Sequence, residues 1–302
     1  MPKIQYIIKR LNAKTLGIVD KANQIIEDYA TQGYSLTLRQ LYYQFVARDL
    51  IENSQKSYKR LGATINDARL VGLIDWEAIE DRTRNLQTLG HWSHPGSIIS
   101  SCARSFNVDL WEGQTHRVEV WVEKDALIGV LEKACKPLDV PYFSCRGYTS
   151  QSELWRAAQR HKSHERHSGQ YTTVLHLGDL DPSGVDMTRD ITDRLDMFGA
   201  NTDVKRIALN MDQVRKYQPP PNPAKVSDSR FHDYARKYGN DSWELDALEP
   251  RVMHSLINHE IEQLIDDDAF NDRRKEQEEG RDLLEKTSDN WPFVVDFLRN
   301  RD

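Results

Sequence analysis

Near the amino terminus, hydrophobic residues recur with the spacing of helices. From 15 to 31 they fall at three- and four-residue steps, which predicts an amphipathic helix. Thr37 can cap a second helix, whose apolar stripe ends at Leu50. A third helix is predicted over 57–72. Three short helices, followed after Trp76 by a polar segment that could form a hairpin, are typical of a helix-turn-helix of winged-helix type.

The pattern changes after a segment without periodicity, from His91 to Gly113, which we interpret as a linker. Short apolar runs then alternate with helical patterns. Strands are predicted at 117–122, 141–144, 172–177 and 204–209, with helices at 124–136, 151–162 and 185–198. This alternation predicts an α/β fold with a parallel sheet that helices cover on both faces. A stiff connector, QPPPNPAK, then leads to helices predicted at 251–265 and 281–299.

Length and composition limit the class of protein. At 302 residues the chain is expected to form two domains, which we place at 1–110 and 111–302. It lacks the long apolar run of a membrane span, and its first residues lack the pattern of a secretory signal, so a cytoplasmic protein is expected. Cys102, Cys135 and Cys145 are odd in number and too far apart for zinc spacing, so unpaired thiols are expected.

Charge is distributed unevenly along the chain. The net charge of −6 argues against a general basic footprint, yet residues 1–72 carry eleven Lys and Arg against six Asp and Glu. This segment is therefore +5, which leaves −11 for the rest. Four cations lie on the third predicted helix: Lys56, Lys59, Arg60 and Arg69. Their face of the helix could bind DNA phosphates or could be a solvated surface, and the sequence favours neither.

Three acidic residues stand where strands of the predicted sheet end. Glu123 follows the first strand, and Asp179 and Asp181 follow the third, in the turn GDLDPSG. Ligands of open α/β sheets bind beyond the carboxyl ends of the strands. Carboxylates that converge there repel one another, and hard oxygen ligands with room for water and phosphate favour Mg²⁺. The alternative for a lone DxD is that it caps a helix or solvates a loop; Glu123 weighs against that alternative.

These motifs resemble those of a known family. VEKDAL at 122–127 together with GDLDPSG at 178–184 is similar to the Toprim domain of topoisomerases and primases. The form DxDPxG is similar to the A subunit of type IIB topoisomerase VI and to the related meiotic double-strand-break transesterase. The resemblance implies a winged-helix domain of the CAP type followed by a Toprim domain. It also implies that Asp179 and Asp181 bind the metal and that Glu123 is a metal ligand or an acid–base group.

An arginine and two tyrosines on the second predicted helix extend the resemblance. In that family the nucleophilic tyrosine lies in a motif R-x-x-[YF]-Y, which RQLYY, from Arg39 to Tyr43, matches. The resemblance therefore makes Tyr43 the candidate nucleophile. Helix geometry separates the tyrosines independently: Tyr42 lies on the apolar stripe, and Tyr43 is rotated off it by about 100°. A guanidinium neighbour favours the phenolate, which phenols with a pKa near ~10 otherwise rarely form. The alternative is that both tyrosines only pack a core.

The resemblance covers about residues 30–265 and carries expectations about partners. The segment from Trp243 to Leu248 is similar to the late acidic stretch of Toprim domains. The resemblance implies a homodimer that acts on double-stranded DNA, with the tyrosine of one protomer at the metal site of the other. The chain is shorter than a typical A subunit and has no Walker A pattern. Any ATP use would therefore belong to a separate GHKL-type ATPase subunit, similar to the B subunit.

Other polar residues have ordinary structural interpretations. The histidine-rich stretch HKSHERH, at 161–167, is interpreted as a solvated helix end. Glu119 is interpreted as a surface acid at the start of a strand. Lys124 and Arg146 could contact phosphate or could serve as ion-pair partners.

Three functions compete at this point. The leading hypothesis is a topoisomerase-like DNA-cleaving transesterase, in which Tyr43 attacks a backbone phosphate and forms a covalent tyrosyl–DNA intermediate. Mg²⁺ held by Glu123, Asp179 and Asp181 would stabilise the charge that develops on the phosphate. The second is a Toprim nuclease, in which metal-activated water replaces the tyrosine. The third is a non-catalytic winged-helix DNA-binding protein.

Overall fold

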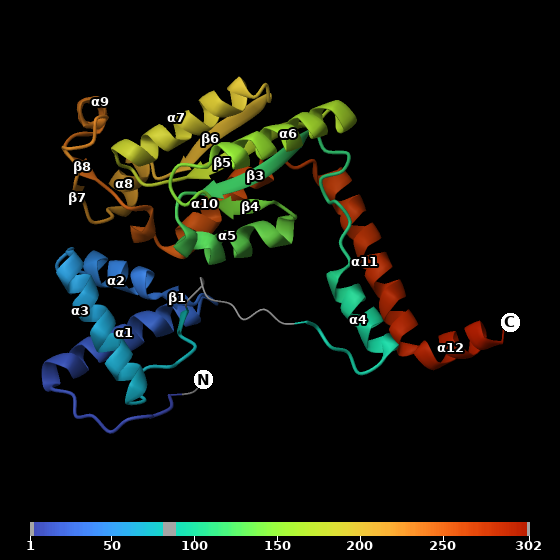
Figure 1. The fold of residues 1–302 in the computed structure, drawn as a ribbon, viewed down its shortest axis with the longest axis horizontal. Helices are drawn as coiled ribbons and strands as arrows, with labels where there is room; N and C mark the ends of the chain where they lie inside the picture. The colour runs from blue at the N-terminus through green and yellow to red at the C-terminus, as the bar shows by residue number, and fades with distance from the viewer. Residues whose placement is uncertain (1–2, 81–88, 301–302) are drawn as a thin grey trace.

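The computed structural model describes residues 3–80 and 89–300, and its amino-terminal part forms a unit of three helices (Figure 1). These helices are α1 (Ala13–Ala30), α2 (Leu38–Ala47) and α3 (Gln55–Leu70). The side chains of Asn12, Thr37 and Ser54 each accept a hydrogen bond from a backbone N–H of the first turn, as helix caps do. The three predicted helices are confirmed.

Two short parallel strands connect the segment between α1 and α2 with the segment that follows α3. They are β1 (Leu36–Thr37) and β2 (Ile79–Glu80). Residues 79–80 belong to the polar segment that was predicted to form a possible hairpin, and they pair in parallel with β1 instead of with a neighbouring strand. Residues 81–88 of that segment lie outside the described residues. The core of the unit extends from Val19 to Ile79 in sequence.

The second unit contains a four-stranded sheet in which all strands are parallel, as predicted. The strands are β3 (His116–Val122), β4 (Tyr142–Ser144), β5 (Tyr171–Leu177) and β6 (Thr202–Ala208). Their order across the sheet is β4-β3-β5-β6. The chain therefore adds β4 on one side of β3 and then continues on the other side with β5 and β6.

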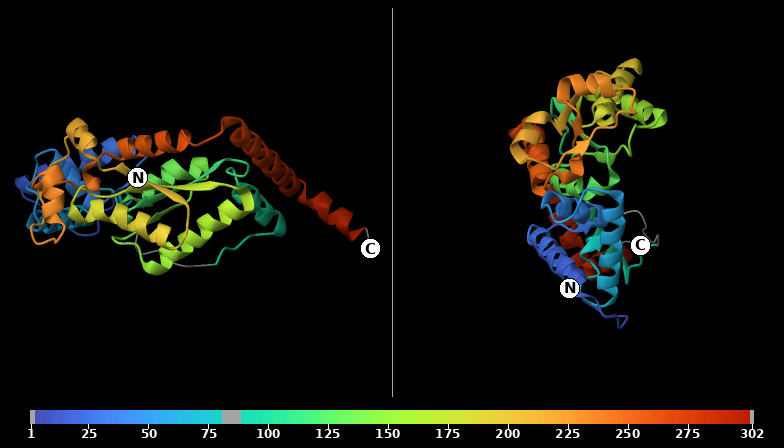
Figure 2. Two further views of the ribbon diagram at one scale, coloured as in Figure 1. Left: turned by 90° about the horizontal axis from the view of Figure 1, so that it is seen from above. Right: turned by 90° about the vertical axis from the view of Figure 1, so that its left-hand side faces the viewer.

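Helices cover both faces of this sheet (Figures 1 and 2). One face packs against α6 (Gln151–Ser168) and α7 (Pro182–Met197) through Trp121, Leu154 and Val174. The other face packs against α5 (Ile128–Cys135), which two 3₁₀ turns flank (Asp125–Leu127 and Lys136–Leu138), and against α10 (Pro250–Glu262). The α/β fold with a parallel sheet between helices is thereby confirmed.

Between β6 and α10 the chain forms short elements beside the carboxyl ends of the strands. These are α8 (Met211–Tyr217), β7 (Asn222–Pro223), α9 (Phe231–Tyr238), β8 (Asp241–Ser242) and the 3₁₀ turn η3 (Leu245–Ala247). β7 lies in the predicted stiff connector and pairs antiparallel with β8. The backbone of Leu180 pairs with that of Trp243, which fixes η3 beside the turn that carries Asp179 and Asp181.

The predicted linker between the units is partly helical. Within 91–113 the chain forms α4 (Pro95–Ser105), which packs on α11 (Asp267–Asp289). A proline at the first helical position and a partner helix stabilise α4, whose own periodicity is too short to detect. The helix predicted at 281–299 is also wrong in its bounds, because α11 begins at Asp267 and α12 (Trp291–Arg299) is separate. No helix within residues 3–80 or 89–300 is both long and apolar enough to cross a membrane.

Glu119 is buried, whereas its position in the strand predicted a surface acid. Its Oε1 lies 2.7 Å from Nε of Arg160 and 3.1 Å from Nε2 of His161, both on α6. The histidine-rich stretch is the end of α6, which stops at Ser168, and it is largely exposed as predicted, except that His161 is 2% exposed and faces Glu119. Helical periodicity turns one position in three or four of this polar stretch towards the sheet.

Glu119→Gln is expected to destabilise the fold at neutral pH and to lose this effect in acid. Although burial opposes ionisation, His161 and Arg160 hold the pKa of Glu119 at about 2, below its usual 4.5. A depressed pKa contributes stability that is present above pH ~4.5 and is lost as the pH falls through ~2, and this shift corresponds to about 3 kcal/mol. Urea unfolding of wild type and variant between about pH 7 and pH 2 measures it.

Glu153→Gln provides the control on α6, the helix that carries Arg160 and His161, because Glu153 makes an exposed pair with Arg156. Its free energy of unfolding should change by less than about 1 kcal/mol at every pH. Equal losses in the two variants, or a loss in Glu119→Gln that does not change with pH, would contradict the role of the buried pair.

Candidate functional site

The sheet order places the ends of β3 and β5 side by side. β4 lies on one side of β3 and β5 on the other, so the switch point of the sheet falls between β3 and β5. Glu123 directly follows β3, and Asp179 follows β5 after Gly178. The backbone N–H of Asp179 donates to Oε2 of Glu123 at 2.9 Å. Two of the three predicted acids therefore meet where open α/β sheets bind ligands.

Asp181 is engaged by the helix that it starts. Its Oδ1 accepts hydrogen bonds from the N–H of Gly184 at 2.6 Å and from the hydroxyl of Ser183 at 3.1 Å. The capping alternative for the DxD turn is thus correct for Asp181, which is the N-cap of α7. Asp181 is also close enough to Glu123 to affect it: burial raises the pKa of Glu123, and the charge of Asp181 adds to this effect.

Gly184 is required by the close packing of this turn. A Cβ at this position would overlap the carbonyl oxygen of Asp179, a backbone atom that has no freedom to rotate away. Gly184→Ala is therefore expected to lower the free energy of unfolding by about 1–3 kcal/mol. Urea unfolding measures this change.

Gly17→Ala on α1 is the control for Gly184→Ala, because no heavy atom of the described residues lies within 4 Å of a Cβ built there. It should be neutral or stabilise the protein by up to ~1 kcal/mol, since alanine favours helix. Equal effects of the two substitutions would show that close approach at Gly184 does not constrain the turn.

A partly buried lysine lies at the centre of the acidic cluster. The Nζ of Lys124 is 2.8 Å from Oδ2 of Asp179 and 3.9 Å from Oδ2 of Asp246, and it also donates a hydrogen bond to Glu244. Burial alone would lower the pKa of Lys124, but these three carboxylates raise it. The sequence left Lys124 between phosphate contact and ion pairing; in this structure it is an ion-pair partner.

The single positive charge of Lys124 does not compensate all the carboxylates of this cluster. Burial raises the pKa of Asp179 and of Asp246, and the charge of Glu244 adds to both effects. The side chain of Asp246 has no exposed surface. Neither of its carboxylate oxygens has a hydrogen-bond partner among the described residues. An orphaned buried carboxylate is costly, and a bound cation would offset that cost.

The donor set fits a hard divalent cation in its chemistry. Carboxylate oxygens, together with water and phosphate oxygens, are the ligands that Mg²⁺ prefers. In the conformation described for residues 3–80 and 89–300, no group of three or more His, Cys, Asp or Glu side chains is arranged to hold a metal ion. The orphaned oxygens of Asp246 are therefore the feature of this structure that supports a cation here.

Helix α2 brings Arg39 and Tyr43 to this cluster within one chain. α2 contacts η3, and Nε of Arg39 lies 4.0 Å from Oδ2 of Asp246. Burial raises the pKa of Tyr43 to about 12, the charge of Glu244 adds to this effect, and Lys124 and a hydrogen bond from Arg39 act in the opposite direction. The phenol is thus neutral at physiological pH and lies beside two cations that favour its ionisation.

The two adjacent tyrosines have different surroundings. The hydroxyl of Tyr42 accepts a hydrogen bond from the N–H of Ser54 and donates one to Oδ1 of Asn53, both at 2.9 Å. These bonds give Tyr42 the structural role that helix geometry predicts. Tyr43 is also buried, being 6% exposed against 4% for Tyr42. Tyr43 belongs to the same core as Tyr42, and the two ring centres lie 5.2 Å apart, so the alternative that both tyrosines pack a core stays open.

Sequence reasoning missed Arg206, which holds the turn after β5. Its guanidinium donates to the carbonyl oxygens of Gly178 and Gly184, both at 2.9 Å, and of Asp179 at 2.5 Å. Both ends of the GDLDPSG turn are therefore tied to one partly buried cation. The only sequence signal is an arginine inside the strand pattern of β6, where a buried charge requires nearby acceptors. Glu244 and Asp246 were covered only by the resemblance of Trp243 to Leu248.

The cations predicted to bind DNA differ in their exposure. Lys56, Lys59 and Arg60 are exposed on α3. Arg69 is not free, because its guanidinium lies 4.6 Å from the ring of Trp76 and donates to the carbonyl oxygen of the same residue. Arg69 thus fixes the end of the three-helix unit, and the other three cations keep the predicted role open.

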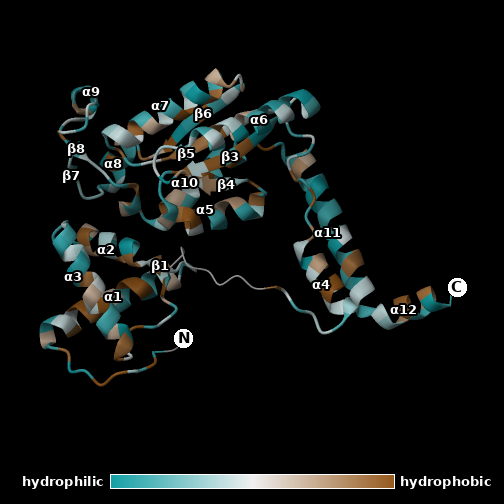
Figure 3. Cartoon of the chain, viewed as in Figure 1, coloured by the Kyte–Doolittle hydropathy of each residue, from teal (hydrophilic) through white to brown (hydrophobic). Residues whose placement is uncertain are grey.

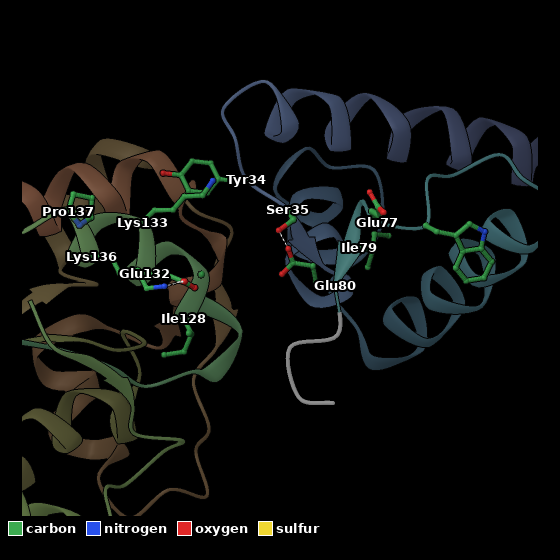
Figure 4. A pocket seen from close by; sticks show the side chains of 12 residues that line it. Tyr34, Ser35, Glu77, Ile79, Glu80, Ile128, Glu132, Lys133, Lys136 and Pro137 are labelled. Atoms are coloured by element: carbon green, nitrogen blue, oxygen red, sulfur yellow. Dashed lines mark hydrogen bonds and ion pairs between the residues drawn. The ribbon is translucent and has the colours of Figure 1, made fainter. Parts of the chain in front are cut away.

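A groove of about 1040 Å³ separates the two units on one side. Side chains of both units face it in Figure 4, among them Tyr34 and Glu77 of the first unit and Lys136 of the second. Nζ of Lys133 lies 3.8 Å from the centre of the Tyr34 ring. Among the described residues that line this groove, none belongs to the acidic cluster. The acidic cluster therefore lies outside this groove.

Comparison of the chain with known protein families, with curated proteins and with solved structures finds no match. The function is therefore inferred from the residues of this site and from their geometry.

Proposed function

We propose that the protein is a Mg²⁺-dependent DNA-cleaving transesterase. In this proposal the three-helix unit is a winged-helix domain and the sheet unit is a Toprim domain, as in the A subunit of topoisomerase VI. The observation that carries the proposal is the position of Arg39 against the acidic cluster, with Tyr43 beside it on α2. An ionisable phenol and a set of buried carboxylates then lie together in one chain. This differs from the arrangement implied by the resemblance, in which a partner protomer supplies the tyrosine.

Tyr43 is the nucleophile in this proposal. Its Oη bonds to a backbone phosphorus while one bridging P–O bond breaks, which leaves a phosphotyrosine on one DNA end and a free hydroxyl on the other. Glu244 is the acceptor for the phenol proton, since Lys124 keeps it ionised against the effect of burial, and the same proton then passes to the oxygen of the leaving DNA end, which becomes the free hydroxyl. Arg39 reduces the cost of forming the phenolate.

The residues that would hold Mg²⁺ are Glu123, Asp179 and Asp181, with Asp246 as a further carboxylate. When bound, the ion polarises the phosphate and offsets the negative charge that develops on it. Arg206 keeps the turn that carries Asp179 in place through its carbonyl oxygens. The protein thus provides a nucleophile, a proton acceptor and a fixed carboxylate set.

Hydrolysis by a Toprim nuclease is the second candidate, and the burial of Tyr43 favours it. Tyr43 is only 6% exposed and its pKa is raised to about 12. Ionising such a phenol at neutral pH costs about 7 kcal/mol unless DNA and cation change its surroundings. A metal-activated water needs no such change.

An adduct assay separates these functions. The protein is mixed with end-labelled duplex DNA and Mg²⁺, denatured with detergent and analysed for DNA that migrates with protein. The transesterase forms an EDTA-sensitive adduct, whereas the nuclease gives free cleaved ends. Binding without either product would overturn both and would leave a DNA-binding protein.

The exposed cations of α3 are expected to contact DNA phosphates. The double substitution Lys56→Ala/Lys59→Ala should weaken duplex binding and reduce the slope of log K against log[salt] by about 0.9 per lost contact. The control removes Lys275 and Lys286 from the carboxyl-terminal helix α11, where their side chains are 77% and 69% exposed. Fluorescence anisotropy over a salt series measures both variants. Equal slopes for wild type and the α3 variant would assign Lys56 and Lys59 to a solvated surface.

A further inference from the structure

Four carboxylates of the acidic cluster come from two turns of the chain. We call residues 178–184 the first acidic turn and residues 243–248 the second acidic turn. The first carries Asp179 and Asp181, and the second carries Glu244 and Asp246. When these groups are ionised together they repel one another, and Lys124 offers them a single positive charge. Other contacts are therefore needed to keep the two turns together.

The backbones of the two turns meet at one short bridge. The N–H of Leu180 donates to the carbonyl oxygen of Trp243 at 2.8 Å, and the N–H of Trp243 donates back to that of Leu180 at 2.9 Å. The N–H of Leu245 donates to Oδ1 of Asp179 at 2.8 Å. This bridge lies outside the strands of the sheet, so no longer ladder of hydrogen bonds supports it.

The hydroxyl of Tyr234 contacts both segments. Its Oη lies 2.8 Å from the carbonyl oxygen of Leu180, in the first acidic turn, and 2.8 Å from that of Asp241, just before the second. Burial raises the pKa of Tyr234 and the charge of Asp181 adds to this effect, so the hydroxyl keeps its proton and remains a donor. One O–H group shared between two carbonyl oxygens holds both segments at hydrogen-bond distance.

Helix α9 carries Tyr234 into this position. Figure 3 shows that most of α9 is hydrophilic, and Tyr234 is the buried residue of this helix, with 5% of its surface exposed. Its ring packs in the same hydrophobic core as Leu180 and Trp243. A surface helix thus inserts one side chain at the junction of the two acidic turns.

The start of α9 is fixed by an arginine. The guanidinium of Arg230 lies 3.0 Å from Oδ2 of Asp186, on α7, and 2.8 Å from Oδ1 of Asp228. The hydroxyl of Tyr148 donates to the same oxygen of Asp186 at 2.6 Å. Because α7 begins at the first acidic turn, these contacts fix α9 relative to that turn. Supporting contacts of this kind keep the groups of a site at a constant spacing.

We propose that Tyr234 is a positioning residue, which holds the two acidic turns together and so keeps their carboxylates in one cluster. It acts through the carbonyl oxygens of Leu180 and Asp241 and touches neither substrate nor cation. A cation bound by the cluster depends on this spacing, and loss of such an outer contact typically lowers metal affinity by roughly 10–100-fold. The binding of Mg²⁺ rests on the proposed function, whereas the contact between the turns does not.

Tyr234→Phe tests the contact between the turns without cation or DNA, because it keeps the ring and removes the hydroxyl. In EDTA, the amide protons of Leu180, Trp243 and Leu245 should exchange at least about 10-fold faster than in wild type, as measured by NMR. Tyr238→Phe, one turn later on α9, is the matched control. Its ring centre lies 5.0 Å from that of Tyr234, and within residues 3–80 and 89–300 no hydrogen bond joins its hydroxyl to either acidic turn. It should leave the three rates unchanged.

Calorimetry then measures the effect on the cation. The dissociation constant for Mg²⁺ should rise at least about 10-fold in Tyr234→Phe and stay at the wild-type value in Tyr238→Phe. A hydroxyl that only supports the fold predicts faster exchange across the whole sheet unit and an unchanged affinity for Mg²⁺, and this result would overturn the proposal. So would unchanged exchange at the three amides. A wild type that neither binds Mg²⁺ nor cleaves DNA would reject the proposed function, and the exchange rates would then decide the role of Tyr234 alone.

Discussion

Tyr43→Phe is expected to abolish the covalent protein–DNA adduct, with a loss of at least ~10⁴-fold in cleavage rate, because no other group replaces a lost nucleophile efficiently. The substitution removes only the hydroxyl, which interacts with Arg39. Stability and DNA affinity should therefore change little. Single-turnover cleavage of end-labelled duplex in Mg²⁺ measures the rate.

Tyr42→Phe is the matched control in the same helix. It removes the hydrogen bonds to Ser54 and Asn53, so it should destabilise the three-helix unit by about 1 kcal/mol and still form the adduct. Cleavage that survives Tyr43→Phe at an unchanged rate would reject the transesterase and favour hydrolysis. If only Tyr42→Phe lost the adduct, Tyr42 would be the nucleophile, and the assignment to Tyr43 would be wrong.

Lys124→Met is expected to have the largest effect on stability. It leaves Asp179, Glu244 and Asp246 together without their central ammonium. Breaking a buried ion pair by removing one partner costs about 3–5 kcal/mol, because the remaining charges are uncompensated. Urea unfolding in EDTA measures this loss.

Mg²⁺ should restore part of the stability of Lys124→Met, and more than it adds to wild type, because a cation at the cluster compensates the same carboxylates. Lys205→Met is the control, since Lys205 makes one partly exposed pair with Glu260 and its loss should cost at most about 1 kcal/mol. A loss for Lys124→Met no larger than that of the control would show that the cluster does not depend on its lysine.

The spacing of hydrophobic residues predicted much of the fold, because this spacing is visible within the sequence of each helix or strand. The stripes of α1 to α3 and the alternation of strands and helices are properties of short windows. The positions of Glu123 and Asp179 also followed, since residues after neighbouring parallel strands must meet at one edge. Both are therefore correctly placed at the switch point between β3 and β5.

What the sequence did not predict depends on contacts between distant segments. Lys124 meets Glu244 across 120 positions, and no local pattern reports that pairing. Glu119 was assigned to the surface because its partners, Arg160 and His161, belong to a helix that follows much later in the chain. The helix α4 was missed because its stability comes from α11 and not from its own short pattern.

The central claim is that Tyr43 and the carboxylate cluster form one active site for covalent DNA cleavage. Mass spectrometry of the trapped adduct tests it most directly. After nuclease and trypsin treatment, the peptide QLYYQFVAR, residues 40–48, should carry a nucleotide, and fragmentation should place it on Tyr43. A nucleotide on Tyr42 or on another peptide, or cleaved DNA with no modified peptide at all, would contradict the account.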